Sequence, residues 1–404
     1  MSVFSRIIRI AVWAVVLCSF ASSSCRHKAS ADRMEHDSSQ TPDTCFYSFD
    51  LSTAAETASN IIINTIVDSM EFIPLEFDLN APVRLEYLMT VETDDGLLLA
   101  NNCTRWFRGV LLFSKTGEFR RTVIGLGHGH NELPPDYYRW SYSKENNELL
   151  MYSRGVCYVY SCDANEGKYL KTDETLVDII PTENGNYLIR PASAQYEDNP
   201  YLKLVDRSGK ELKAFRHEKK KNIYYETPPY DVGPNEHYLL RQGGRGEILF
   251  KDLFNDTIYV YENDYLSPRF ALNAHDNRPN IKDVSNKQRK MNQIYLSDIA
   301  TVGKYLLCQY EYAGEIFNQL VFDCSTRKVV CSSLFKLSMR GAGTAHSYRN
   351  RIPFQLQTPT GKAIWIGITG FGEGVIYGVA NPVDVSDFLG TDAESNPVLI
   401  KMYI

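Results

Sequence analysis

Short runs of apolar and aromatic residues alternate with polar turns along most of this chain. The run Leu111–Phe113 leads into the turn Ser114–Glu118, and the run Val156–Tyr160 leads into the turn Ser161–Gly167. Runs of this kind, separated by Gly, Asn and Asp, are typical of antiparallel β-strands joined by hairpins. No stretch carries a long apolar stripe with helical spacing, so the pattern predicts few helices.

The pattern of strand and turn repeats along the chain. The distance from Gly117 to Gly167 is 50 residues, from Gly167 to Gly209 it is 42, and from Gly209 to the turn at Arg327 it is 118, which corresponds to two units. A β-propeller has a period of this size, because each blade is a sheet of four short antiparallel strands. The 346 residues of the segment 59–404 are enough for six blades, with seven as the alternative.

A ring of sheets needs its two ends to meet, because an open ring leaves unpaired strand edges. The segments 61–67 and 70–75 resemble strands near the N-terminus, and the segment 397–404 resembles a strand at the C-terminus. We therefore expect an all-β protein, a six-bladed β-propeller that is closed by pairing of its N-terminal and C-terminal strands.

Residues 1–24 have the three-part pattern of an export signal. Arg6 and Arg9 precede the apolar core 10–20, and small residues lead from there to Cys25. This core is too short to span a bilayer comfortably, so a membrane anchor is the less favoured alternative.

Cys25 stands where a bacterial lipoprotein would be cleaved and acylated, and the segment before it resembles a lipobox, although Ser22 replaces the commoner Leu. Acyl chains there would hold the protein on a membrane. Secretion without a lipid is the alternative. Residues 25–58 are polar and rich in Ser, Thr and Ala, which predicts a flexible tether, and the propeller would then occupy residues 59–404.

One set of residues points to a known family. The series Gly117-Glu118-Phe119, Ile124-Gly125, Gly127, Gly129 and Glu132 resembles the G-x-F…I-G-x-G-x-G-x-x-E signature of the six-bladed β-propeller lipoproteins of the Bacteroides type, which are similar to NHL-repeat propellers. The segments 254–259 and 396–400 match as well. The glycine loop departs from the family where His130-Asn131-Glu132-Leu133 replaces Pro-Gly-Glu-Tyr. The resemblance implies a surface or periplasmic lipoprotein and supplies no catalytic residues.

The glycine loop also contains possible metal ligands. His128, His130 and Glu132 could face one way on an extended segment and ligate a divalent metal. A turn already explains the glycines, however, and the family loop has no histidines. We therefore expect neither a metal nor a cofactor.

Aromatic and arginine side chains form the favoured binding candidates. Loops at one propeller face would expose Trp106, Arg108, Tyr137 and Trp140, and such combinations are common where proteins recognise sugars or other proteins. Packing between blades is the alternative for each of them. The Asp94-Asp95-Gly96 segment, in contrast, is interpreted as an ordinary hairpin turn.

The chemistry favours binding over catalysis. The chain contains no G-x-S-x-G motif, and a net charge of −6 with a pI near 5.8 gives no basic field for nucleic acid. We interpret the protein as a non-catalytic, lipid-anchored protein of the cell envelope, in the outer membrane or periplasm, that binds a glycan or an envelope protein. The alternatives are a propeller enzyme that acts on a glycan and a structural subunit of an envelope complex.

Overall fold

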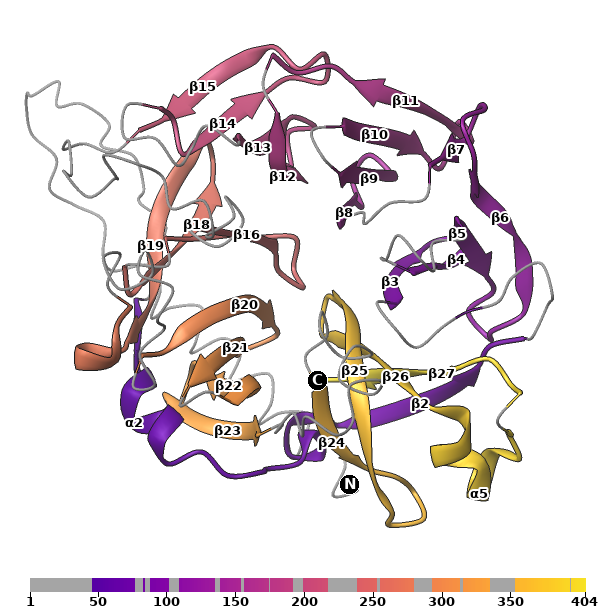
Figure 1. Cartoon of the computed structure of the whole chain (residues 1–404), viewed down its shortest axis with the longest axis vertical. Helices are drawn as coiled ribbons and strands as arrows, with labels where there is room; N and C mark the ends of the chain where they lie inside the picture. The colour runs from indigo at the N-terminus through magenta and orange to yellow at the C-terminus, as the bar shows by residue number, and fades with distance from the viewer. Residues whose placement is uncertain are drawn as a thin grey trace, which may run out of the picture. The chain divides into compact units, whose positions relative to one another are not determined.

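The computed structural model of the chain describes residues 46–76, 83, 88–101, 109–134, 139–153, 156–173, 175–191, 199–216, 238–252, 255–279, 293–312, 315–334, 353–392 and 394–404. Residues 45–404 form one compact unit in which six sheets are arranged around a central axis (Figure 1). The predicted six-bladed β-propeller is therefore confirmed.

We number the blades in chain order and give the strands of each from the axis outward. Blade 1 contains β3 (Leu88–Thr93), β4 (Gly96–Asn101), β5 (Val110–Phe113), β6 (Phe119–Leu126) and the short β7 (Glu132–Leu133). Blade 2 contains β8 (Arg139–Ser143), β9 (Glu148–Ser153), β10 (Val156–Ser161) and β11 (Glu166–Leu170). Blade 3 contains β12 (Leu176–Pro181), β13 (Tyr187–Pro191), β14 (Leu202–Val205) and β15 (Glu211–Phe215).

The second half of the ring includes strands from the start of the chain. Blade 4 contains β16 (Tyr238–Gln242), β17 (Ile248–Asp252), β18 (Thr257–Glu262), β19 (Tyr265–Asn273) and β1 (Tyr47–Asp50). Blade 5 contains β20 (Tyr295–Val302), β21 (Tyr305–Tyr312), β22 (Glu315–Asp323) and β23 (Lys328–Ser333). Blade 6 contains β25 (Ala363–Gly372), β26 (Val375–Ala380), β27 (Val398–Tyr403) and β2 (Ser69–Pro74), and β24 (Pro353–Gln357) pairs with the first half of β25.

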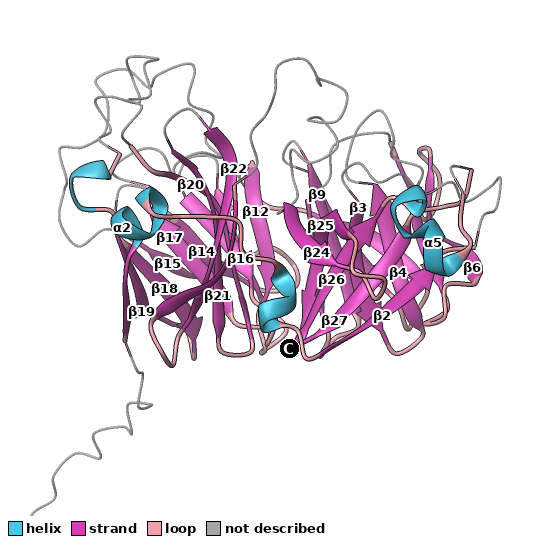
Figure 2. Ribbon diagram, turned by 90° about the horizontal axis from the view of Figure 1, so that it is seen from below, coloured by secondary structure: helices cyan, strands magenta, loops and turns pink. Residues whose placement is uncertain are grey.

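The helical elements of the described chain are short. They are α2 (Leu51–Glu56), α5 (Ser386–Leu389) and the 3₁₀ turns η1 (Ile63–Ile66), η4 (His275–Asn277) and η6 (Pro382–Val385). Figure 2 shows the strands running between the two faces of the ring, with α2 and α5 at its outer edge. Among the described residues, no helix has the length and apolar character needed to cross a membrane.

Apolar clusters between the blades explain the hydrophobic pattern of the sequence. The described residues form six buried clusters, one between each pair of neighbouring blades. A central strand is therefore covered on both faces, and all four residues of β5 are buried. Such strands have continuous apolar runs in place of the alternation seen in half-exposed strands.

The ring closes as the sequence predicts. β2 pairs antiparallel with β27, from Ser69 opposite Tyr403 to Pro74 opposite Val398 (Figure 1). A strand from near the start of the chain, β2, is thus the outermost strand of the blade that contains the C-terminal strand β27. Its Ile73 is 3% exposed and packs in the cluster between blades 6 and 1.

Two expectations about the N-terminal region differ from the structure. The strand expected over 61–67 is wrong, because Ile63–Ile66 is a 3₁₀ turn whose buried isoleucines fill the space between blades 5 and 6. Part of the expected tether, residues 46–58, is also ordered. Its strand β1 pairs parallel with β19, and Phe49 and Leu51 are buried between blades 4 and 5. Residues 25–45 lie outside the described part of the chain.

A buried group of charges connects the inner strands of blades 2 and 3. Asp178 on β12 and Arg190 on β13 are 0% and 1% exposed, and the Arg190 guanidinium donates two hydrogen bonds to one Asp178 oxygen. The other oxygen accepts from Arg139 on β8, at 2.9 Å, and from the Tyr152 hydroxyl. Burial alone would raise the pKa of Asp178, but Arg190 and Arg139 hold it well below its ordinary range.

The thiols of the described region are unpaired. Cys157, Cys162, Cys308, Cys324 and Cys331 are all free, and all except Cys162 are buried. These residues therefore behave as small apolar side chains of the strands and their turns.

The role of β2 can be tested by a single substitution. Ile73→Ala removes buried methyl groups at the closure of the ring, so the free energy of unfolding should fall by about 2 to 5 kcal/mol. Glu71→Ala on the same strand is the matched control, because Glu71 is exposed and should change stability by less than about 0.5 kcal/mol. Equal urea denaturation midpoints for the two variants would show that β2 does not stabilise the ring.

The buried charges predict a pH-dependent effect of Asp178→Asn. The substitution removes the charge that pairs with Arg190, so it should lower the free energy of unfolding at neutral pH by about 3 kcal/mol. Because the pKa of Asp178 is depressed in the folded state, its stabilisation is present above about pH 4 and is lost as the pH falls further. The difference between the two proteins should therefore shrink below about pH 4 in urea denaturation.

Glu211→Gln is the control for this experiment. Glu211 pairs with Lys203 in the same blade, but its side chain is 47% exposed, so a change below about 1 kcal/mol is expected. If the stability difference between Asp178→Asn and the wild-type protein stays constant from neutral pH to pH 3, the ionised Asp178 carboxylate is not the source of the stabilisation.

Candidate functional site

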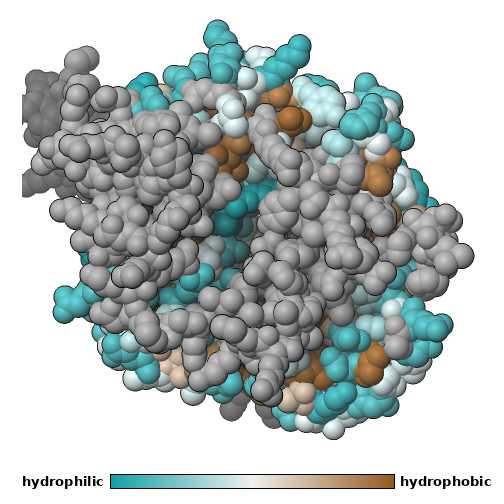
Figure 3. Space-filling view, viewed as in Figure 1, coloured by the Kyte–Doolittle hydropathy of each residue, from teal (hydrophilic) through white to brown (hydrophobic). Residues whose placement is uncertain are grey.

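A cavity of about 820 Å³ lies on the axis and is lined by residues from the inner strands of all six blades. Figure 3 shows a hollow at the centre of the face from which Figure 1 is drawn, and its visible residues are hydrophilic. Sites for small ligands have volumes of about 300 to 1,000 Å³. The cavity is therefore the best candidate for a functional site in the described structure.

One end of the cavity is closed by the turn between β16 and β17. The Gly244 amide donates to the Thr301 carbonyl of blade 5 at 2.8 Å, and a Cβ on Gly244 would lie 2.6 Å from the Gly372 carbonyl oxygen of blade 6. Just before the turn, the Gln242 side chain donates to the Tyr142 carbonyl of blade 2 at 2.8 Å. The turn thus crosses the axis and forms the floor of the cavity.

Irregular pairing places polar groups on the wall. Three of the six inner strands carry a bulge next to their second strand, at Val177 in β12, at Ser297 in β20 and at Thr369 in β25. A bulge interrupts the strict alternation of side chains, so neighbouring residues can reach the same side. Ser297 and Asp298 accordingly both line the cavity, although they are consecutive in the sequence.

Two arginines and an aspartate stand on one half of the wall. Arg139 and Arg241 come from blades 2 and 4, and Asp298 comes from blade 5. The Arg241 Nε donates to Asp298 Oδ1, and its Nη1 donates to the Leu240 carbonyl at 2.9 Å. Burial opposes the charge of Arg241, but Asp298 and Asp178 raise its pKa, so the guanidinium stays ionised.

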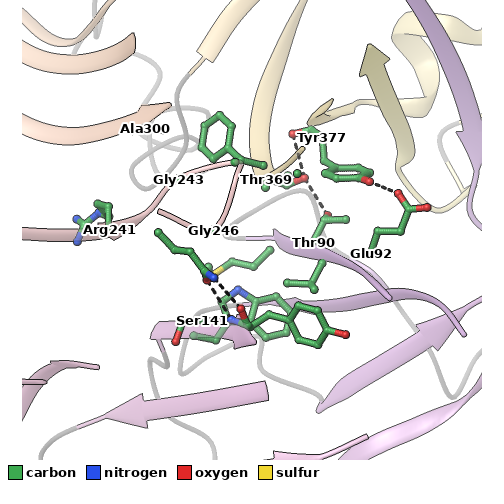
Figure 4. Close-up of a pocket in the computed structure, with 18 of the residues that line it drawn as sticks. Thr90, Glu92, Ser141, Arg241, Gly243, Gly246, Ala300, Thr369 and Tyr377 are labelled. Atoms are coloured by element: carbon green, nitrogen blue, oxygen red, sulfur yellow. Dashed lines mark hydrogen bonds between the residues drawn. The ribbon is translucent and has the colours of Figure 1, made fainter. Parts of the chain in front are cut away.

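Hydroxyl and carboxylate groups form the wall at the contact of blades 1 and 6 (Figure 4). The hydroxyls of Thr90 and Thr369 lie 2.9 Å apart, and the Thr369 hydroxyl also donates to the Tyr377 carbonyl at 3.3 Å. Glu92 accepts a hydrogen bond from the Tyr377 hydroxyl and another from Lys401 Nζ at 2.7 Å. Burial would raise the pKa of Glu92, but Lys401 and Tyr377 together lower it.

The structure places one of the four predicted binding residues in this wall. Trp140, on β8, is partly buried, packs on the cluster between blades 1 and 2, and lines the cavity. Trp106, Arg108 and Tyr137 lie outside the described residues, as does the predicted lipidation residue Cys25. The expectation that the candidates share one surface therefore stays a prediction.

The weak metal candidates lie at the outer edge of blade 1, where β7 pairs parallel with β6. His128 and His130 are exposed, but Glu132 is engaged in the loop itself, because its Oε2 accepts from the Gly129 amide at 2.8 Å. Asn131 binds the neighbouring blade through the Asn165 carbonyl and the Gly167 amide. The described residues contain no group of three or more His, Cys, Asp or Glu side chains that could hold a metal. The hydrogen bonds of Asn131 make the loop a connection between blades 1 and 2.

Sequence reasoning does not find Arg241, Asp298 or Thr369. Arg241 and Asp298 are 57 residues apart, and no local motif marks either of them. Asp298 and Thr369 become recognisable only when the blades are aligned on the turn that follows each inner strand. In that alignment Asp178, Asp298 and Thr369 fall at similar positions of their inner strands.

Comparison with known proteins supports the fold. No curated protein matches this chain significantly. Among solved structures, a Bacteroides fragilis protein whose name suggests that it is exported has a TM-score of 0.60 at 14% identity, over 89% of this chain and 99% of that one.

Two further solved structures are less similar. A Bacteroides thetaiotaomicron protein of unknown function has a TM-score of 0.42 at 10% identity, over 85% of this chain and 75% of that one. Virginiamycin B lyase of Staphylococcus aureus has a TM-score of 0.40 at 10% identity, over 83% of this chain and 99% of that one. These scores carry no argument about function.

The sequence itself matches one family. Residues 46–403 match the profile of the family described as Domain of unknown function (DUF4934). This match begins at Phe46, one residue before β1, and ends at Tyr403, the last residue of β27, so it includes both ends of the ring. The chain belongs to the DUF4934 family.

Proposed function

We propose that this protein is a non-catalytic binding protein of the cell envelope and that it holds a glycan in its central cavity. The observation that carries the proposal is the composition of the cavity wall. It combines an aromatic side chain, Trp140, with hydroxyl, amide and guanidinium groups from several blades. Sugars need this combination, because their ring faces are apolar while their edges carry hydrogen-bonding hydroxyls.

The shape of the cavity suits the end or a short branch of a chain. The β16–β17 turn closes one end, so a ligand would enter through the hollow seen in Figure 3 and could not pass through the ring. The inner strands that form the wall are fixed by the apolar clusters behind them. A wall that is formed before the ligand arrives loses little conformational entropy on binding.

The states of Glu92 and Asp178 argue against either residue as the acid catalyst of a glycosidase. Glycosidases of the usual type need a carboxylic acid with a raised pKa that can protonate the leaving group. Glu92 lines the cavity and Asp178 stands behind its wall, and the pKa of each is lowered by hydrogen bonds or cations around it. Both are therefore held in the ionised form, which is the wrong form for an acid catalyst.

The proposed location follows from the start of the chain. Residues 1–24 have the pattern of an export signal, and Cys25 is in position for acylation. The name of the Bacteroides fragilis structure, which suggests export, agrees with this proposal. A lipid at Cys25 would attach the propeller to a membrane through residues 26–45, and the cavity would face ligands outside the cytoplasm.

A substitution at Trp140 tests the binding site. Trp140→Ala should weaken binding of a glycan identified on a polysaccharide array by about tenfold, because the stacking surface is lost. Isothermal titration with the purified mature protein measures the effect. Trp365→Ala is the matched control, since Trp365 lies on the part of β25 that pairs with β24 and is not in the cavity wall. If Trp140→Ala binds the glycan as tightly as the wild-type protein does, the central cavity is not the glycan-binding site.

A substitution at Cys25 tests the location. The wild-type protein, expressed in a Bacteroides host, should incorporate radiolabelled palmitate and sediment with the membrane fraction. Cys25→Ser should be unlabelled and should appear in the soluble fraction, because the thiol that accepts the lipid is gone. Absence of label from the wild-type protein would rule out the lipid anchor.

A further inference from the structure

We infer that the glycan bound in the central cavity is acidic and that Arg241 binds its carboxylate, in competition with Asp298. This inference rests on the proposed function and names the class of ligand. It starts from the way in which the Arg241 guanidinium is paired.

Arg241 uses only part of its hydrogen-bonding capacity within the described structure. Nε donates to Asp298 Oδ1 and Nη1 donates to the Leu240 carbonyl, while Nη2 has no partner among the described residues. A guanidinium binds a carboxylate best through two parallel N–H groups. Asp298 does not engage Arg241 in this way, because it accepts from Nε alone and takes a second hydrogen bond from the Ile299 amide at 3.0 Å.

The unused donors are accessible from the cavity. Arg241 is one of its lining residues, and its side chain is 24% exposed (Figure 4). A ligand carboxylate that reached Nη2 and the free hydrogen of Nη1 would form the parallel pair that Asp298 leaves open. Because the site is partly desolvated, each such charge-assisted hydrogen bond would be stronger than at an open surface.

The charges around Arg241 also favour an anion. The described strands of the wall carry Arg139 and Arg241 and two carboxylates, those of Asp298 and Glu92. Glu92 is already neutralised, because it accepts hydrogen bonds from Lys401 and Tyr377 of blade 6. Behind the wall, the buried charges of Asp178 and Arg190 balance each other. The remaining charged lining residues lie at the turn end of the cavity or next to it, where both signs are present. A negative group is therefore attracted to the level of Arg241.

The rest of the wall indicates a carbohydrate as the carrier of this carboxylate. The wall also carries the hydroxyls of Ser297 and Thr369, the amide of Gln309 and the indole of Trp140. These groups match the hydroxyls and the apolar face of a sugar ring. Uronic acids combine such a ring with a planar carboxylate.

The test compares two probes that differ only in the acidic group. Hyaluronan hexasaccharide and its carboxyl-reduced form are titrated into the purified mature protein. Because charge-assisted hydrogen bonds contribute about 1.5 to 3 kcal/mol, the wild-type protein should bind the acidic probe about ten- to a hundredfold more tightly. A sulfated dextran oligosaccharide serves as a third probe, and tighter binding of this probe than of hyaluronan would overturn the assignment to a carboxylate.

Three variants separate a specific role of Arg241 from a structural one. Arg241→Gln should abolish the preference for the acidic probe, because it should lower the affinity for the acidic probe much more than the affinity for the reduced probe. Asp298→Asn should increase the affinity for the acidic probe, because it removes the competing charge from Nε. Arg269→Gln is the matched control in the same blade, since Arg269 has the same side-chain exposure of 24% and pairs with Glu262 outside the cavity. It should behave as the wild-type protein does, and thermal melting confirms that each variant is folded.

The outcomes distinguish this inference from the proposed function. If the wild-type protein binds both hyaluronan probes equally well, or if Arg241→Gln weakens both equally, the acidic-ligand inference is overturned while glycan binding stands. If neither these probes nor any glycan on the array binds, the proposed function fails and the inference fails with it. Weaker binding of the acidic probe by Asp298→Asn would show that Asp298 is no competitor.

Discussion

The structure depends on the backbone pairing of β2 with β27. Each blade of a propeller covers one face of the next, so every sheet is buried on both sides only if the last blade also meets the first. Here β2 supplies the outermost main strand of blade 6, and its Ile73 extends the apolar cluster between blades 6 and 1. Without this strand, β27 would present an open edge and part of that cluster would face water. Glu92 of blade 1 adds a second connection, because it accepts hydrogen bonds from Tyr377 and Lys401 of blade 6.

Closure also determines what the cavity can be. Once the ring is fixed, the inner strands face one another across the axis, and their side chains can meet although they are distant in sequence. The Gln242 side chain reaches the backbone of Tyr142, and the backbone of Gly244 reaches that of Thr301. At Gly370 the inner strands of blades 6 and 1 approach so closely that a Cβ would lie 2.2 Å from the Thr90 carbonyl oxygen. The wall and the floor are therefore consequences of the ring, and small residues are required where strands or turns touch.

The sequence predicts the parts of the fold that repeat and misses those that occur once. Runs such as Leu111–Phe113 are recognisable because every blade needs apolar residues on both faces of its sheet. The segment from Tyr47 to Glu56 looks like a tether, since only Phe49, Leu51 and Ala55 of it are buried and the residues of blades 4 and 5 in their cluster lie more than 180 positions away in the sequence. The run 61–67 has the composition of a strand, but its buried isoleucines fill the space between two blades as a 3₁₀ turn. Trp140 can be chosen from the sequence as an aromatic candidate for ligand contact, whereas the pairing of Arg241 with Asp298 depends on the ring geometry.

The charges of the wall are the basis on which we propose a ligand for this cavity. Buried ion pairs rarely stabilise a fold more than apolar side chains of the same volume would, because removing charges from water is costly. The Asp178–Arg190 pair is accounted for within the fold, because the charge of each residue compensates for the burial of the other. Arg241 is different, since it faces the cavity with a guanidinium that Asp298 engages through one nitrogen only. We propose that a ligand carboxylate completes the hydrogen bonds of the donors that Asp298 leaves open.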